Sequence, residues 1–399
     1  MPLALIATPT PPPTPDQPDG AAAVLRAALQ RGPLARTAIS RETGLSPAAV
    51  SRHTADLLAL GLVYEPPARQ SPPRPGRPRV PLDIDTGYHL AVGVHIAIPQ
   101  LTFSLTDLRG QVVAQEQTAR ADSPAEVLRD IAGHLPGLLR RHAAGRSVLG
   151  LGVVTGGWVD PDFGTVVENS ALGWRNVPVR RLLQSATRLP IHVEGHARAL
   201  AQAELLFGAA QGGDLVHLFV GNAVDAAIAV GGTLMRGRGN GAGGVAHLPV
   251  AGSVAACPCG ATGCLQATVS DRAFAERAVA TGIIPRPEIA LLTTAARGGD
   301  QRALELCRER LRLIAPTVAL LLDMISPELL VLTEAITLRL PELLPYLHQQ
   351  IAARTRTDPS RLVRSSSFGS DVLAVAAGTP VLAAVHQDPM ALRTAAMAR

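Results

Sequence analysis

The chain has 399 residues, enough for two or three domains, and its 47 % hydrophobic and 17 % charged residues are typical of a soluble globular protein. No apolar run approaches the roughly 18–20 residues of a membrane span, and the opening MPLALIA is too short for a signal sequence, so we expect a cytoplasmic protein with no membrane partner. The formal net charge is +5, and residues 21–84 alone hold nine arginines against four acidic residues, an excess of +5. This distribution predicts an N-terminal unit that meets a polyanion.

Residues 1–20 are rich in proline and lack apolar periodicity, which predicts a disordered or extended leader. Three helices are expected next, over 21–30, 35–44 and 47–61. Gly44 ends the second helix, and Ser46 and Pro47 suit the N-cap and first turn of the third. Two helices joined by a short turn form a helix-turn-helix, whose second helix enters the major groove. A generic three-helix bundle is the alternative.

The third helix should bury one apolar face and present another to DNA. The residues expected in the core are Val50, Leu57, Leu58 and Leu60. The residues expected to face DNA are Ser46, Ala48, Ala49, Ser51, Arg52 and His53. Arginine bonds guanine edges or phosphate, serine bonds either, and alanine packs on thymine methyl groups.

A strand, a proline-rich basic loop and a return strand follow over 61–84, which predicts a wing. The loop spaces four arginines with proline and glycine: Arg69, Arg74, Arg77 and Arg79. Arg74, Arg77 and Arg79 are candidates for binding the DNA backbone or minor groove. A flexible basic linker between domains would have the same composition.

From Tyr88 the pattern changes to strands over 89–97, 101–110, 111–119 and 147–156, with an amphipathic helix over 125–144. Further segments predict a helix over 178–189, a strand and helix over 191–210 and paired strands over 214–235. The remainder is mostly helical, over 271–280, 303–325, 336–354 and from Gly378, with a strand pair at 328–335 and 371–377.

The segment HLPVAGSVAACPCGATGC holds four candidate metal ligands: His247, Cys257, Cys259 and Cys264. Three thiolates and an imidazole on tightly turned backbone suit a tetrahedral Zn²⁺ site with a structural role, because four protein ligands leave no position for water. A disulfide is the alternative. Cys307, in an apolar helical pattern, is expected to be a buried small hydrophobe.

The pattern H-x(9)-C-x-C-G-x-x-G-C-L resembles the zinc signature of the ROK family, which groups sugar-responsive repressors with sugar kinases. TGLSPAAVSRHTADLLALGLVYE also resembles the winged-helix domains of ROK repressors. The resemblance implies an α/β fold: a winged helix-turn-helix over 21–84, then a two-lobed actin-like ATPase (ROK) domain over 85–399. Its lobes would span 85–195 with the C-terminal helix, and 196–380.

The resemblance also allows a test for kinase chemistry. ROK kinases carry D-x-G-G-T in the first strand turn, whereas this chain has His95-Ile96-Ala97-Ile98-Pro99. Where the family has an N-D pair with the catalytic base, this chain has Gly195-His196. Where the family has a glycine pair on the adenosine side, this chain has Thr333-Glu334. We therefore expect no enzyme activity, with an ATP-dependent sugar kinase carrying a DNA-binding head as the alternative.

The sugar site implied by the resemblance is changed as well, because family Asn and Glu positions hold Ala171, Gly244 and Gln266. Either a different effector, such as a sugar derivative, is bound or ligand control is absent. The residues expected near the effector are Asn169, Glu194, His196, His247 and Gln266.

Together these patterns predict a DNA-binding transcriptional regulator, most simply a repressor, similar to the xylose and N-acetylglucosamine repressors. One winged helix gives limited specificity, so a homodimer or homotetramer on an inverted repeat of double-stranded DNA is expected.

Overall fold

The computed structural model describes residues 20–67, 80–210 and 212–393. The chain divides into two compact units, Met1–Ile84 with Ala384–Arg399, and Asp85–Ala383. By contacts, the end of the chain groups with the N-terminal unit, where Arg393 lies 2.6 Å from Asp56. Nearly all of the expected leader and the four wing arginines lie outside the described residues: 1–19, Arg69, Arg74, Arg77 and Arg79.

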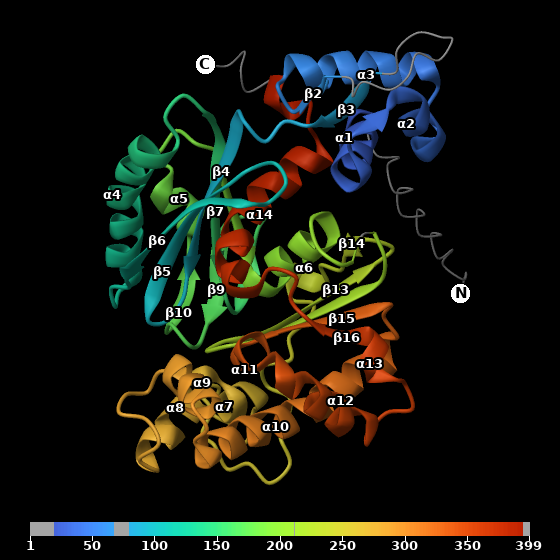
Figure 1. The fold of residues 1–399 in the computed structure, drawn as a ribbon. Coiled ribbons are helices and arrows are strands. Elements are labelled where there is room, and N and C mark those ends of the chain that lie inside the picture. Colours follow the sequence, from blue (N-terminus) through green and yellow to red (C-terminus); the bar gives the residue numbers. More distant parts are fainter. Residues whose placement is uncertain (1–19, 68–79, 211, 394–399) are drawn as a thin grey trace, which may run out of the picture. The chain divides into compact units, whose positions relative to one another are not determined.

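Three helices and a small sheet form the first unit (Figure 1). The helices are α1 (Gly20–Arg31), α2 (Arg36–Thr43) and α3 (Pro47–Ala59). Gly20, which we placed in the leader, begins α1. Gly44 ends α2 with a φ of 71°, a left-handed conformation that glycine adopts without steric cost, and Ser46 Oγ accepts the Ala49 N–H as the N-cap of α3. The expected helix-turn-helix is present.

One face of α3 supplies part of the core of this unit. Val50 and Leu57 are fully buried as expected, and Thr54 is buried between them. Leu58 and Leu60 are only half-buried, contrary to expectation. Positions 50, 54 and 57 follow the helical repeat along one stripe, whereas Leu58 falls on its edge.

The sheet of the first unit has the order β1-β3-β2. Its strands are β1 (Leu34–Ala35), β2 (Val63–Tyr64) and β3 (Pro81–Ile84). Both neighbours pair antiparallel with β3, in the register Leu34↔Leu82 and Val63↔Ile84. The β2–β3 pair that follows α3 is the framework of the predicted wing.

The first lobe of the second unit is built on a mixed five-stranded sheet in the order β11-β7-β4-β5-β6. Its strands are β4 (His89–Ile96), β5 (Gln100–Thr106), β6 (Val112–Ala119), β7 (Ser147–Thr155) and β11 (Ile191–Gly195). Helices α4 (Pro124–His142) and α5 (Val179–Leu183) cover one face, and α14 (Val372–Gln387) lies on the other (Figure 1). A second, three-stranded antiparallel sheet, which the sequence analysis missed, consists of β8 (Trp158–Asp160), β9 (Thr165–Asn169) and β10 (Trp174–Val177).

The second lobe has a five-stranded sheet in the order β14-β13-β12-β15-β16. Its strands are β12 (Leu215–Val220), β13 (Val224–Val230), β14 (Thr233–Leu234), β15 (Leu329–Glu334) and β16 (Val363–Ser365). Its α-helices are α6 (His196–Leu206), α7 (Leu265–Val269), α8 (Asp271–Ala280), α9 (Ile289–Arg297), α10 (Gln301–Ile325), α11 (Ala335–Arg339), α12 (Leu344–Ala352) and α13 (Pro359–Leu362). Short 3₁₀ turns are η1 (Arg238–Asn240), η2 (Pro341–Leu343) and η3 (Gly369–Asp371).

Alternation along β12 separates two cores. Val216 and Leu218 pack into a cluster with α8, α9, α10 and α12, whereas Leu215 and Phe219 pack against α6 and α14. Successive side chains of a strand point to opposite faces, so His217 shares the face of Leu215 and Phe219. Cys307 is fully buried in the first of these clusters, as expected for a small hydrophobe.

The segment 371–377, expected as a strand, is helical instead: Asp371 ends η3, and residues 372–377 belong to α14. Its alanine-rich sequence favours a helix, and its burial on several sides hides the helical period that an amphipathic helix would show. The strand beside β15 is β16, in parallel register. The helix expected over 336–354 is interrupted, because Pro341 lacks the N–H that would continue α11.

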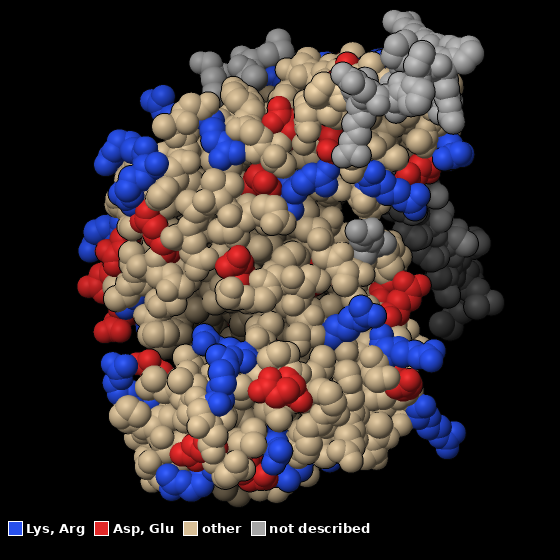
Figure 2. Space-filling model, viewed as in Figure 1, with Lys and Arg blue, Asp and Glu red and all other residues tan. Residues whose placement is uncertain are grey.

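Within the described ranges, one apolar segment, Gly369–Gln387, has the length and composition of a membrane span. In this fold 67 % of its apolar window is buried, as in the core helix of a globular protein. Arginine and acidic side chains are interspersed on the face seen in Figure 2.

Candidate functional site

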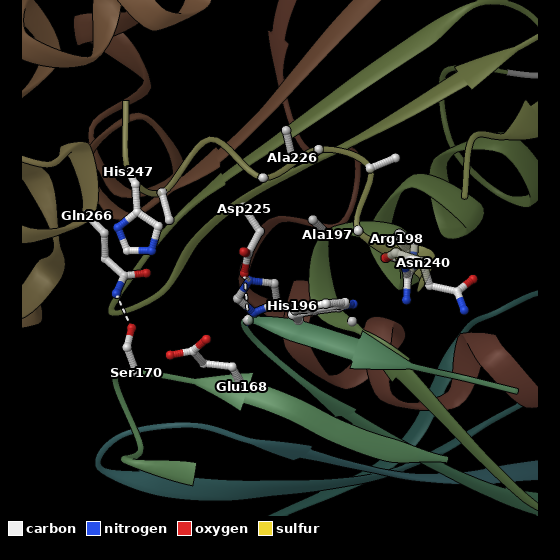
Figure 3. A pocket seen from close by; sticks show the side chains of 18 of the residues that line it. Glu168, Ser170, His196, Ala197, Arg198, Asp225, Ala226, Asn240, His247 and Gln266 are labelled. Atoms are coloured by element: carbon white, nitrogen blue, oxygen red, sulfur yellow. Dashed lines mark hydrogen bonds and ion pairs between the residues drawn. The ribbon is translucent and has the colours of Figure 1, made fainter. Parts of the chain in front are cut away.

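A cavity of about 390 Å³ lies between the two lobes of the second unit. The first lobe contributes Glu168 and Ser170, and the second contributes Asp225, His247 and Gln266 (Figure 3). Its volume is that of a site for a small molecule, and a position between lobes is a usual place for one. We refer to it as the interlobe pocket.

The buried His196 and the half-buried Asp225 form a pair at the wall of the interlobe pocket. His196 is the first residue of α6, and its Nε2 lies 2.8 Å from Asp225 Oδ2 on β13 (Figure 3). Burial opposes ionisation of Asp225, but the His196 ring and the Gly157 N–H outweigh it, so the pKa of this carboxyl is held below its usual value. Asp225 is therefore a carboxylate that links the two lobes.

Gln266 also bridges the lobes. Its Nε2 donates to Ser170 Oγ at 2.8 Å, and its Oε1 accepts the Val224 N–H at 3.1 Å (Figure 3). Both ends of the amide are thus bonded within the chain.

The structure brings together three of the five residues expected near an effector: His196, His247 and Gln266. The other two face into the fold. Asn169 Nδ2 donates to the Gly156 carbonyl, and Glu194 lies 2.6 Å from Arg198 in a buried ion pair. Asn169 lines a smaller neighbouring cavity of about 100 Å³ instead.

The four candidate metal ligands converge. One ligand atom from each of His247, Cys257, Cys259 and Cys264 lies within 4.8 Å of all the others. The distances from Cys257 Sγ to His247 Nδ1 and from Cys259 Sγ to Cys264 Sγ are both 3.7 Å. A tetrahedron with metal–sulfur bonds of about 2.3 Å has edges of about 3.8 Å. All four cysteines of the chain are free, so the disulfide alternative is wrong, and the cluster could hold a metal ion.

The helix-turn-helix presents a candidate DNA-binding face. Ser46, Ala48, Ser51 and Arg52 are exposed, and Ala49 is half-buried. His53 differs, because a Cβ added at Gly20 would lie 2.4 Å from His53 Nε2, so this ring packs against the start of α1. Arg52 is consequently the basic side chain that α3 can offer to a base or phosphate.

The model of the ROK family matches residues 91–377, and that of bacterial regulatory proteins of the arsR family matches residues 27–65. A transcriptional regulator of Mycobacterium tuberculosis, Rv0485, is 33 % identical over 386 residues, which cover 93 % of this chain and 86 % of that protein. The chain belongs to the ROK family.

Another relative is the N-acetylglucosamine repressor of Escherichia coli O157:H7, 27 % identical over 88 % of this chain and 91 % of that protein. Among solved structures, a ROK family transcriptional regulator homologous to the E. coli MLC protein matches with a TM-score of 0.76 and 23 % identity, over 94 % of this chain and 97 % of that one. A ROK family glucokinase from Streptomyces griseus matches with a TM-score of 0.64 and 24 % identity, over 72 % of this chain and 98 % of that one. The ROK fold of the second unit is thus common to regulators and kinases.

Two of the positions that the sequence comparison singled out, His95 and Glu334, hold buried side chains in this ROK protein. His95 is fully buried 5.9 Å from the His196 ring, and its two ring nitrogens have no hydrogen-bond partner among the described residues. Burial, and then the neighbouring His196, lower its pKa to about 3, so it is neutral. Glu334 accepts the Ile336 and Thr337 N–H groups and lies 3.6 Å from the buried Arg310.

The residues of the interlobe pocket that the sequence analysis missed include Asp225, Trp158 and Arg238. Asp225 lies near the start of β13, just after the turn that follows β12. Trp158 lies on a strand that we did not predict. The glycine-rich segment around Arg238 indicates close backbone packing, as at Gly243, where an added Cβ would lie 1.9 Å from the Ala226 carbonyl oxygen.

Proposed function

We propose that this ROK transcriptional regulator represses its target genes by binding two half-sites of an inverted DNA repeat as a homodimer, or as a homotetramer of such dimers. The names of its relatives as regulators and repressors support the proposal. One recognition helix contacts only a few base pairs in one stretch of the major groove. Two recognition helices spaced roughly 34–36 Å apart contact two half-sites and so give the specificity of an operator.

The observation that carries the proposal is the capped α3 with its exposed Arg52. Ser46 fixes the start of this helix, and Gly44 sets the turn before it, so the position of Arg52 relative to α2 is defined. Arg52 would read a base edge, with Ser51 and Ala48 beside it, while Arg74, Arg77 and Arg79 would hold the backbone or the minor groove.

The test is a gel-shift series on a duplex selected from a random pool by the purified protein. We expect Arg52→Ala to reduce discrimination between the selected duplex and a scrambled one by about 1–3 kcal/mol. Arg26→Ala, which removes an exposed arginine of α1, is the matched control and should leave discrimination unchanged.

The wing is tested in the same assay. Replacing Arg74, Arg77 and Arg79 by alanine should weaken binding to all duplexes. The slope of log affinity against log salt concentration should become shallower by about 0.9 for each phosphate that the variant no longer neutralises. If Arg52→Ala and the wing variant both bind as the parent does, the docking scheme is wrong.

We assign Zn²⁺ to the His247–Cys264 cluster on the strength of its thiolate-rich donor set and tetrahedral spacing. The ion would tie the loop of Cys257 and Cys259 to His247 and supply folding energy to the second lobe. One zinc per chain is expected by metal analysis. Cys264→Ser should lose the zinc and lower the unfolding temperature, whereas Cys307→Ala, which changes a buried cysteine away from the cluster, should retain it. A Cys264→Ser protein of unchanged stability would contradict a structural role.

The rival function is an ATP-dependent sugar kinase with a DNA-binding head, which draws on the fold shared with the glucokinase. The neutral His95 and the hydrogen-bonded Glu334 support the proposal that the ROK domain does not catalyse phosphoryl transfer. A coupled assay with ATP and a panel of hexoses decides between them, because turnover would overturn the regulator-only account.

A further inference from the structure

The interlobe pocket differs from a sugar site in what its polar groups are free to do. Gln266 is bonded at both ends. Asp225 Oδ2 accepts the Gly157 N–H and lies 2.8 Å from His196 Nε2. Arg198 uses Nε, Nη1 and Nη2 on Glu194 and on the carbonyls of Asn240 and Val159. A hexose presents a hydroxyl on nearly every carbon, and each buried hydroxyl left without a partner costs roughly 1–3 kcal/mol. Because the Gln266 amide and the Arg198 guanidinium are already occupied, they disfavour a polyhydroxylated ligand.

Much of the remaining wall has no hydrogen-bonding side chain. It consists of Ala197, Ala226, Gly241, Ala242, Gly243, Gly244 and Ala246. Gly243 has no room for a side chain, since an added Cβ would meet the Ala226 carbonyl. Such a wall has no bulky side chain, and it leaves room for the flat body of a ligand.

Trp158 adds an aromatic surface to this wall. Its indole Nε1 donates to the Gly239 carbonyl at 2.7 Å, which satisfies the polar edge of the ring and fixes its orientation. The side chain is nevertheless 45 % exposed and lines the pocket. A ring held in this way offers its surface for stacking by another ring.

Four ion-forming side chains of Arg, Asp and Glu line the pocket, and three of them are paired within the chain. Glu168 lies 3.0 Å from Arg175, Asp225 is paired with His196, and Arg198 is paired with Glu194. The fourth, Arg238, is exposed and has no charged or hydrogen-bonding side-chain partner among the described residues. Arginine matches a carboxylate with two parallel hydrogen bonds, so the unpaired guanidinium of Arg238 favours a ligand that carries a carboxylate.

From this arrangement we infer that the interlobe pocket binds a small aromatic carboxylate, with its ring against Trp158 and the glycine–alanine wall and its carboxylate on Arg238. The inference rests on the proposed function, in which the bound molecule is the effector of a DNA-binding regulator. The ligand inferred here is not a sugar. Its carboxylate matches the unpaired Arg238, and its ring matches the exposed surface of Trp158.

The test uses the full chain and isothermal titration with phenylacetate, its uncharged analogue phenylacetamide, and D-glucose. Phenylacetate should bind, and phenylacetamide should bind at least about tenfold more weakly, because it lacks the charge that Arg238 would pair. Arg238→Gln should lower the affinity for phenylacetate by a similar factor. Arg236→Gln is the matched control, since Arg236 pairs with Asp162 at 3.2 Å and does not line the pocket.

Three results would overturn the inference: equal binding of phenylacetamide, tighter binding of D-glucose, or equal reductions in affinity for Arg238→Gln and Arg236→Gln. Absence of phenylacetate binding would overturn it too. The gel-shift assay without any ligand separates these failures from failure of the proposed function, because DNA binding by the ligand-free chain would leave the regulator assignment standing.

Discussion

The stability of the second unit should fall on mild acidification because of two buried histidines, His95 and His217. Burial lowers the pKa of each to about 3, with a smaller contribution from His196, whereas the unfolded chain has a value near 6.5. Between pH 6.5 and 3 the unfolded state therefore binds more protons than the folded state. The contribution of the two neutral histidines to folding stability is fully present above pH 6.5 and is lost as the pH falls toward 3.

The size of the effect follows from these values. Between pH 7 and pH 5 each histidine should cost about 2 kcal/mol of folding free energy, so the two together cost about 4 kcal/mol. The pKa of His192 is also lowered by burial, so this residue acts in the same direction. The lowered pKa of Glu116, about 2, and that of Asp225 place the titration of these carboxyls below this window.

The measurement is urea unfolding at pH 7 and pH 5, followed by tryptophan fluorescence. Both tryptophans, Trp158 and Trp174, lie in the first lobe, as His95 does, so the signal reports on the relevant part. His95→Leu removes one titrating ring without removing a hydrogen bond, since neither ring nitrogen has a partner among the described residues. The variant should lose about 2 kcal/mol less than the parent between the two pH values. An unchanged pH dependence in the variant would refute the assignment of a buried neutral imidazole at His95.

Two further changes test the packing of the second lobe. Arg310→Leu should cost about 3–5 kcal/mol in urea unfolding, because Glu334 would be left buried without its compensating charge, and adding Glu334→Gln should recover part of that stability. If the double variant is no more stable than Arg310→Leu, the two groups are not coupled. Gly243→Ala should lower the unfolding temperature and distort the pocket wall, because φ at this residue is 90° and the added Cβ would lie 1.9 Å from the Ala226 carbonyl oxygen. Gly244→Ala, whose Cβ would be 3.8 Å from its nearest neighbour, is the control and should have a smaller effect.

Some features were determined by the sequence alone because they depend on neighbouring residues. The cap at Ser46, the turn at Gly44 and the spacing of the metal-ligand candidates are local properties of the backbone, and their outcome does not depend on distant packing. The strands β4 and β12 could also be predicted, because each is buried along its whole length and appears in the sequence as a short, mainly apolar run. The resemblance to ROK proteins supplied the order of these elements.

Only the tertiary structure decided which polar groups are free. Gln266 and Asp225 are bonded across the two lobes, to partners 96 and 68 residues away in the chain, so no local pattern could show that they are already satisfied. The same holds for His53, whose ring is turned toward α1, and for the segment 371–377, where burial on several sides removes the period that separates helix from strand. Hydrogen bonds and burial between distant segments are set by packing, and they determine what remains available to a ligand.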